Sequence, residues 1–241
     1  MSLHAGLKRW YSQPGDEVEM RVDGYVVDIV RGDLLIEIQT RNFSALKRKL
    51  TRLLETHTVR LVYPIAKEKW IVKDPGLTPT PGVESGQVAE RRAAYAGGTK
   101  NRRKSPRRGQ WEHVFVELVR IPLLALHPNF TLEVVLTREE EIQALDGRGS
   151  WRRKGWSIYD RRLIGVVERR TFSAAADYLA LLPPGLPHPF TTRDLARGMG
   201  QPRYLAQKMV YCLREMGALR PAGKRGKSYL YEEVYDEKQE S

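Results

Sequence analysis

Residues 16–40 consist of short apolar runs that are separated by two glycine-containing turns. The pattern predicts three antiparallel strands, at residues 18–22, 25–31 and 34–40. Asp23-Gly24 and Gly32-Asp33 supply the tight turns, because glycine adopts positive φ without steric cost. The strand residues are mostly β-branched or aromatic, which suits a pleated, half-buried surface.

Apolar residues at helical spacing occur both before and after these strands in the sequence. A short helix is expected at residues 3–11 with Ser2 as its N-cap, and a longer amphipathic helix at 42–57 with Asn42 as its N-cap. Two further strands are predicted at 59–65 and 69–72. This part of the chain therefore has the order α-β-β-β-α-β.

The composition changes at residues 74–110, where prolines and glycines precede a tract rich in arginine and lysine. We expect a mobile insertion or a long loop there. Strand character returns at 111–126 and 130–136, a short helix is predicted at 139–145, and a last strand at 163–168. These elements are expected to extend the sheet, so the first domain would cover residues 1–170.

The C-terminal residues 171–241 carry a different pattern. Helices are predicted at 172–182, from Thr191 or Thr192, and from Pro202 to Met216, followed by a β-hairpin with a basic tip. The pattern resembles the winged helix-turn-helix family over residues 172–235. That resemblance implies that the third helix enters the major groove of DNA and the hairpin contacts its backbone. Protein contacts or dimerisation are the alternative.

The net charge of the chain narrows the class of binding partner. Lysine and arginine number 41 against 29 acidic residues, which gives a net charge of +12 and favours a polyanion such as nucleic acid. The single cysteine, Cys212, fits a reducing compartment. No apolar run is long enough to span a bilayer, and the N-terminus lacks a secretory pattern, so we expect a cytoplasmic protein without a membrane segment.

Two acidic residues stand among apolar neighbours on adjacent predicted strands. In the simplest hairpin register Asp28 lies near Glu37, and Glu37 and Gln39 project from the same side of the third strand. Burying two carboxylates together is costly unless a cation or a proton compensates. A divalent metal with hard oxygen ligands satisfies this requirement best.

An Asp on one hairpin strand followed by Glu37-Ile38-Gln39 on the next resembles the signature of the PD-(D/E)xK nuclease superfamily. The resemblance covers residues 3–72 and implies a restriction-endonuclease-like α/β fold, a mixed sheet flanked by helices. It implies that Asp28 and Glu37 hold Mg²⁺ or Mn²⁺ with the main-chain carbonyl of Ile38. Gln39 stands where lysine is usual, so it would orient the water or the phosphate without adding charge.

The first helix lacks the acidic residue that it often contributes in that superfamily, and Glu17 or Glu19 is the candidate replacement. Cationic and amide side chains are candidates for DNA contact, with a solvated surface as the alternative for the charged runs. The tryptophans at 151 and 156 interleave with one of these runs, and packing is the alternative role for them. The candidates are Lys47, Arg48, Arg102, Arg103, Lys104, Arg107, Arg108, Arg152, Arg153, Lys154, Arg203, Gln207, Lys208, Lys224, Arg225 and Lys227.

The sequence thus predicts a metal-dependent DNA endonuclease in which a winged helix assists DNA binding. A non-catalytic DNA-binding protein or regulator built on a degenerate nuclease fold is the alternative. A nuclease whose winged helix recruits a protein partner is a third hypothesis, and a homodimer stays open.

Overall fold

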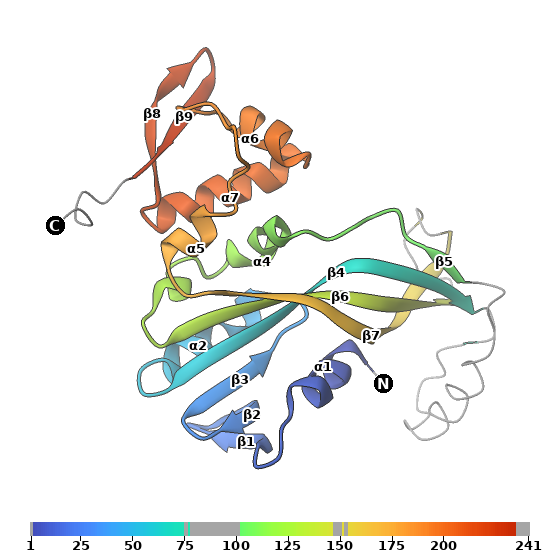
Figure 1. The fold of residues 1–241 in the computed structure, drawn as a ribbon. Coiled ribbons are helices and arrows are strands. Elements are labelled where there is room, and N and C mark those ends of the chain that lie inside the picture. Colours follow the sequence, from blue (N-terminus) through green and yellow to red (C-terminus); the bar gives the residue numbers. More distant parts are fainter. Residues whose placement is uncertain (1, 75–76, 78–101, 147–150, 152–153, 235–241) are drawn as a thin grey trace. The chain divides into compact units, whose positions relative to one another are not determined.

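The computed structural model describes residues 2–74, 77, 102–146, 151 and 154–234. In the first half of the chain the elements are α1 (Leu3–Tyr11), β1 (Glu17–Val22), β2 (Tyr25–Arg31), β3 (Leu34–Ile38), the 3₁₀ helix η1 (Phe43–Leu46), α2 (Lys47–Leu53), β4 (Thr58–Asp74) and β5 (Arg102–Lys104). They are followed by η4 (Trp111–Val114), α4 (Phe115–Leu118), η5 (Leu124–Leu126), β6 (Phe130–Leu145), β7 (Trp156–Phe172), α5 (Ala175–Leu179), α6 (Thr192–Met199), α7 (Arg203–Glu215), β8 (Leu219–Arg225) and β9 (Ser228–Glu233) (Figure 1).

Within the described residues, seven strands form a mixed sheet in the order β1-β2-β3-β4-β6-β7, and β5 pairs with β4. β1, β2 and β3 are antiparallel, whereas β3 and β4 are parallel. Parallel neighbours need a crossover connection, which η1 and α2 provide between β3 and β4. The protein is a mixed α/β protein whose large sheet is flanked by helices.

The chain divides into two compact units. One consists of Met1–Ser12, Ala66–Gly109 and Val135–Glu168, and the other of Gln13–Ile65, Gln110–Val134 and Arg169–Ser241. The long strands β4, β6 and β7 have residues in both units. The β1–β2–β3 hairpins, α2 and all C-terminal helices belong to the second unit.

The first hairpin forms where the sequence predicts it, and β2 has the predicted bounds. Asp23 and Gly24 have φ values of 48° and 82°. Positive φ at both central residues is the conformation of a two-residue turn that matches the twist of the flanking strands. Ile29 and Ile36 pair across β2 and β3 and are fully buried, so the hairpin contributes to the core.

The predicted caps of α1 and α6 are confirmed. The Ser2 hydroxyl accepts a hydrogen bond from the Ala5 N–H at 3.3 Å. Thr191 and Asp194 form a reciprocal capping box, in which the Thr191 hydroxyl accepts from the Asp194 N–H and the Asp194 carboxylate accepts from the Thr191 N–H. These bonds satisfy backbone donors that the first turn of a helix leaves without partners.

The C-terminal helices pack around the apolar face of α7. α7 buries Leu205, Met209 and Leu213, which recur at four-residue steps as the sequence predicts. The hairpin of β8 and β9 follows, and Phe190 pairs with Tyr231 of β9 through two backbone hydrogen bonds of 3.0 and 2.8 Å. The predicted helices near residues 192 and 203 and the predicted hairpin are therefore present.

The helix predicted at 139–145 is wrong, because β6 continues as a strand to Leu145. Its glutamates favour a helix locally, but Glu139 and Glu141 are buried and hydrogen-bonded. Lys69 Nζ lies 2.8 Å from Glu141 Oε2, and the Thr137 hydroxyl donates to Glu139 at 2.6 Å. Lys69 is remote in sequence, and Thr137 is two residues from Glu139 on the same strand. These contacts override local helix propensity.

Other element predictions also need correction. Residues 111–126 form short helical turns instead of a strand, the predicted strands 59–65 and 69–72 are one strand β4, and β7 extends well beyond 163–168. The predicted helices 42–57 and 172–182 are confined to η1–α2 and to α5. Asn42 has φ of 60° and makes no side-chain cap bond to the backbone. Part of the expected loop at 74–110 is the strand β5, while residues 78–101 lie outside the described residues.

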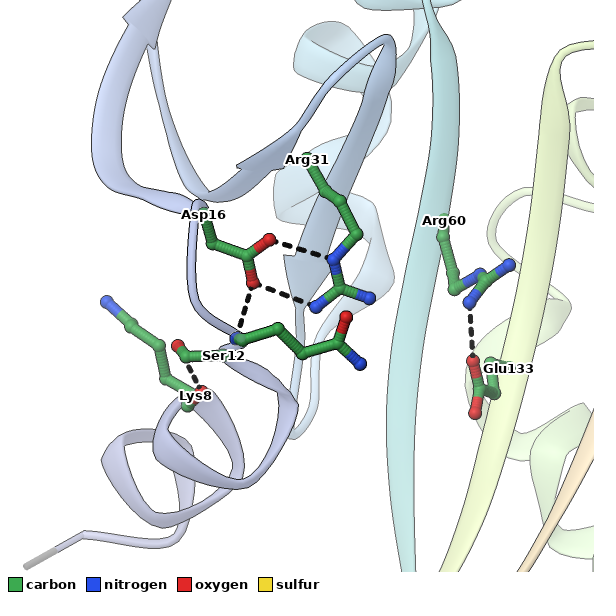
Figure 2. Close-up of polar contacts among 7 residues, drawn as sticks. Lys8, Ser12, Asp16, Arg31, Arg60 and Glu133 are labelled. Atoms are coloured by element: carbon green, nitrogen blue, oxygen red, sulfur yellow. Dashed lines mark hydrogen bonds and ion pairs between the residues drawn. The ribbon is translucent and has the colours of Figure 1, made fainter.

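A bidentate ion pair joins the approach to β1 with the end of β2 (Figure 2). The Arg31 Nε and Nη2 atoms each lie 2.8 Å from an Asp16 carboxylate oxygen, and the Gln13 N–H also donates to Asp16 at 2.8 Å. The Asp16 side chain is 3% exposed. The hydrogen bond from Arg31 holds the pKa of Asp16 below its ordinary value.

We expect Asp16→Asn to lower the Tm by a few degrees near neutral pH. Because the folded-state pKa of Asp16 is lowered, its stabilisation is present above the unfolded-state pKa and is lost as the pH falls through the folded-state value. The difference in Tm should therefore narrow in strong acid. Thermal melts across pH measure it, with Asp33→Asn, an exposed acid in the next turn, as the control. A difference that is constant with pH would contradict the ion-pair account.

Candidate functional site

The candidate site lies where β2 and β3 stop pairing. Their ladder joins Arg31 with Leu34 and continues to the pair of Ile29 with Ile36. Continuing this register brings Asp28 level with Glu37 on the same face of the sheet. Beyond that level, the Ile38 N–H donates to Asp28 Oδ2 at 2.9 Å instead of extending the ladder. The divergence of the two strands thus fixes the Asp28 carboxylate beside β3.

Glu37 is 7% exposed and has a cationic partner from α2. Lys49 Nζ lies 2.5 Å from Glu37 Oε2 and donates to the Val26 carbonyl at 2.6 Å. Burial raises the pKa of Glu37 above its ordinary value. Lys49 opposes that rise, and the nearby Asp28 carboxylate adds to it. Glu37 and Asp28 therefore lie close enough to interact electrostatically.

Gln39 follows the last residue of β3. Its backbone N–H donates to the Val62 carbonyl at 2.9 Å, so the backbone stays beside β4. Its side-chain amide donates to the carbonyls of Arg41 and Asn42, at 2.5 and 3.2 Å. The amide is thus held by the loop that leads to η1. The cation beside Glu37 comes from Lys49 instead.

Lys49 is the site residue that sequence reasoning missed. In the sequence it is one of several cations on an amphipathic helix, and helical spacing does not tell which of them points at a carboxylate. A glutamine at 39, where lysine is usual in the resembled family, was the available signal. A missing charge at that position is consistent with a cation that comes from another element.

Glu19 on β1 is level with Asp28, because Val18 pairs with Ile29 and Met20 pairs with Val27. Its φ is 58°, a conformation that is strained for a residue with a side chain. In the parts of the chain that the structure describes, no three His, Cys, Asp or Glu side chains cluster closely enough to hold a metal ion. The Asp28 and Glu37 carboxylates are close enough to interact electrostatically.

A basic hollow lies between α2 and the β1–β2 turn. It measures about 1060 Å³ and is lined by the predicted DNA-binding residues Lys47 and Arg48, together with Arg52. Asp23 and Glu55 also line it. The helix carrying Lys49 therefore presents further cations to an open surface that can accept an anionic chain.

A second polar surface lies between α7 and the β8–β9 hairpin. The predicted residues Arg203, Gln207 and Lys227 line a hollow there. Lys208 does not, since its Nζ donates to the Val116 carbonyl at 2.9 Å. Arg225 forms an ion pair with Asp194.

The remaining predicted DNA-binding residues are scattered. On β5, Arg102 pairs with Glu140 at 3.1 Å and Lys104 pairs with Glu68 at 2.6 Å, so acidic neighbours balance both charges. Arg152 and Arg153 lie outside the described residues. Several others sit at exposed positions or in turns, namely Arg103, Arg107, Arg108 and Lys154.

This architecture defines a mixed α/β protein in which Asp28 and Glu37 are level on adjacent strands of one hairpin. The family model described as "Domain of unknown function (DUF8091)" matches residues 1–80 and 80–173, and the chain belongs to this family. An uncharacterized protein of Treponema pallidum (strain Nichols) is 30% identical over 231 residues, which cover 95% of this chain and 83% of that protein. No solved structure matches the chain. None of the described helices has the length and apolar character needed to cross a membrane.

We expect Lys49→Met to lower the free energy of unfolding by about 3 kcal/mol at about pH 8, because it leaves a buried carboxylate without its cation. The loss should shrink at about pH 5. Because the folded-state pKa of Glu37 is raised, protonation of Glu37 stabilises the fold below the unfolded-state pKa. This stabilisation is lost as the pH rises through the folded-state pKa. At lower pH Glu37 is protonated and tolerates the loss of Lys49 better.

Denaturant unfolding at the two pH values measures the effect. Arg52→Met is the matched control, since Arg52 pairs with Glu55 on the exposed face of the same helix and should change stability by less than about 1 kcal/mol. Equal losses for Lys49→Met at both pH values would show that Lys49 does not compensate the Glu37 carboxylate.

Proposed function

We propose that this protein is a metal-dependent DNA endonuclease with a restriction-endonuclease-like fold and a C-terminal winged helix. One observation carries the proposal: Asp28 and Glu37 lie opposite each other on two diverging strands, and Lys49 forms an ion pair with Glu37. The α-β-β-β-α-β order supports it, as does the parallel pairing of β3 with β4 after an antiparallel hairpin. The net charge of +12 supports a nucleic acid as substrate.

The donor set suits Mg²⁺ or Mn²⁺. Both ions prefer hard oxygen ligands, and Mg²⁺ commonly binds through one or two carboxylates while keeping water and substrate oxygens in its remaining positions. Asp28 and Glu37 would hold the ion, with the Ile38 carbonyl as a further donor. When bound, the ion would lower the pKa of a coordinated water and stabilise charge on the phosphate.

The protein's own groups prepare this site. Lys49 opposes the rise in the pKa of Glu37 that burial causes. The Ile38 N–H orients the Asp28 carboxylate. Lys49 also supplies, from α2, the positive charge that Gln39 lacks. Glu19, which is level with Asp28, is the candidate for a further acid that joins when substrate binds.

DNA would contact the cations around the site. Lys47, Arg48 and Arg52 line the hollow beside α2, and cations held near a surface bind the phosphate backbone without reading sequence. The C-terminal elements support a winged helix, because the solvent side of α7 carries Arg203 and Gln207 and the β8–β9 hairpin carries Lys224 and Lys227.

The purified protein should cut DNA when Mg²⁺ or Mn²⁺ is present. Asp28→Ala should reduce cleavage on the order of 100-fold or more, because metal ligands matter at least as much as the outer groups that orient them. Gel assays on single-stranded, duplex and branched DNA measure this, with Asp33→Ala in the neighbouring turn as the control. Failure to cut any of these substrates, or normal cutting by Asp28→Ala, would reject the endonuclease.

A non-catalytic DNA-binding protein is the second candidate function. The specific observation in its favour is that Lys49 already neutralises Glu37, which weakens the demand for a metal ion. Metal titration separates the two candidates. A binding protein should bind DNA equally well with and without divalent cations, whereas the endonuclease should gain affinity as well as activity from them.

A further inference from the structure

The hollow between α7 and the β8–β9 hairpin combines aromatic rings with cations. Its volume is about 270 Å³. Both the helix and the hairpin contribute a ring and a cation to its walls. The residues that carry the argument are Tyr211, Tyr229, Arg203, Arg214 and Lys227.

The two tyrosine rings are exposed to solvent. Tyr211 is 45% exposed and Tyr229 is 55% exposed. Lys224 Nζ lies 4.8 Å from the centroid of the Tyr229 ring, so a cation already lies against that ring. Exposed rings beside cations are the features with which proteins hold unpaired bases and their phosphates.

The charge of the hollow fits the same kind of ligand. Among its described lining residues there is no Asp or Glu. Arg203 and Arg214 are eleven positions apart on α7, which corresponds to about 16 Å along the helix axis. Two cations at this spacing can hold a short length of phosphate backbone on either side of the hollow.

The size of the hollow excludes a double helix from its interior. A volume of about 270 Å³ is below the roughly 300–1,000 Å³ of pockets that enclose a drug-sized ligand. One planar base fits such a volume, whereas a base pair within a duplex does not. Duplex DNA would contact only the rim.

We propose that the surface between α7 and the β8–β9 hairpin binds an unpaired nucleotide of DNA. The base stacks against Tyr211 and Tyr229, and the adjoining phosphates contact Arg203, Arg214 and Lys227. The inference rests on the proposed DNA substrate and narrows it to DNA with a single-stranded part, such as a tail, a gap or a branch point.

Fluorescence anisotropy of the full chain in EDTA tests the proposal without cleavage. The probes are a labelled thymine oligonucleotide, a blunt duplex, and the same duplex with a single-stranded tail. The oligonucleotide and the tailed duplex should bind more tightly than the blunt duplex. Tyr211→Ala should weaken binding of both roughly 10-fold, the loss expected for one stacked base, and should leave blunt-duplex binding unchanged.

Two further variants keep the result interpretable. Tyr211→Phe keeps the ring and should retain affinity. Tyr204→Ala removes a ring that is 53% exposed on the same helix but does not line the hollow, and it should bind like the parent. Preference for the blunt duplex, or equal losses in Tyr204→Ala and Tyr211→Ala, would overturn the inference.

The outcome is separable from that of the endonuclease proposal. Because the binding assay contains no divalent metal, a protein that never cuts DNA can still show the tail preference and its dependence on Tyr211. Conversely, metal-dependent cutting that Asp28→Ala abolishes can persist when Tyr211→Ala leaves single-strand binding unaltered.

Discussion

The ion pair between Glu37 and Lys49 is the interaction on which the candidate site depends. A carboxylate buried on a central strand is costly, and a cation within hydrogen-bonding distance lowers that cost. Lys49 meets that need and also bonds the Val26 carbonyl, so one side chain ties α2 to both β2 and β3. The helix position, the strand divergence and the ionisation of Glu37 are therefore linked.

The same constraint acts along β6, where Glu133, Glu139 and Glu141 are buried. Arg60 lies 3.4 Å from Glu133 (Figure 2), and Lys69 lies 2.8 Å from Glu141. The Thr137 hydroxyl donates a hydrogen bond to Glu139, and burial raises the pKa of Glu139. Buried charges paired across strands penalise a shifted register, so these pairs favour a single alignment of β6.

The candidate site and the C-terminal hollow are built from similar elements. In each, cations from a helix lie beside a neighbouring hairpin. At the first site buried carboxylates add the donors that a divalent ion prefers. At the second, exposed tyrosines take their place, which favours a base over a metal ion. The lining residues of the two basic surfaces thus differ in chemistry, and the two proposals follow that difference.

The sequence by itself determined the features that depend on near neighbours. The turn at Asp23-Gly24, the bounds of β2, the caps at Ser2 and Thr191 and the apolar face of α7 all follow from local backbone preference and periodicity, which a single segment contains. It also placed Asp28 near Glu37, because a tight turn fixes the register of a hairpin.

Only the tertiary structure decided which cation meets Glu37, where the Gln39 amide points, and that residues 139–145 form a strand. Each of these outcomes depends on a partner that is remote in sequence or on which side of a strand is buried. Local propensity carries no information about such partners, and the free energy of pairing a buried charge exceeds the few tenths of a kcal/mol, roughly, by which ordinary residues differ in helix preference.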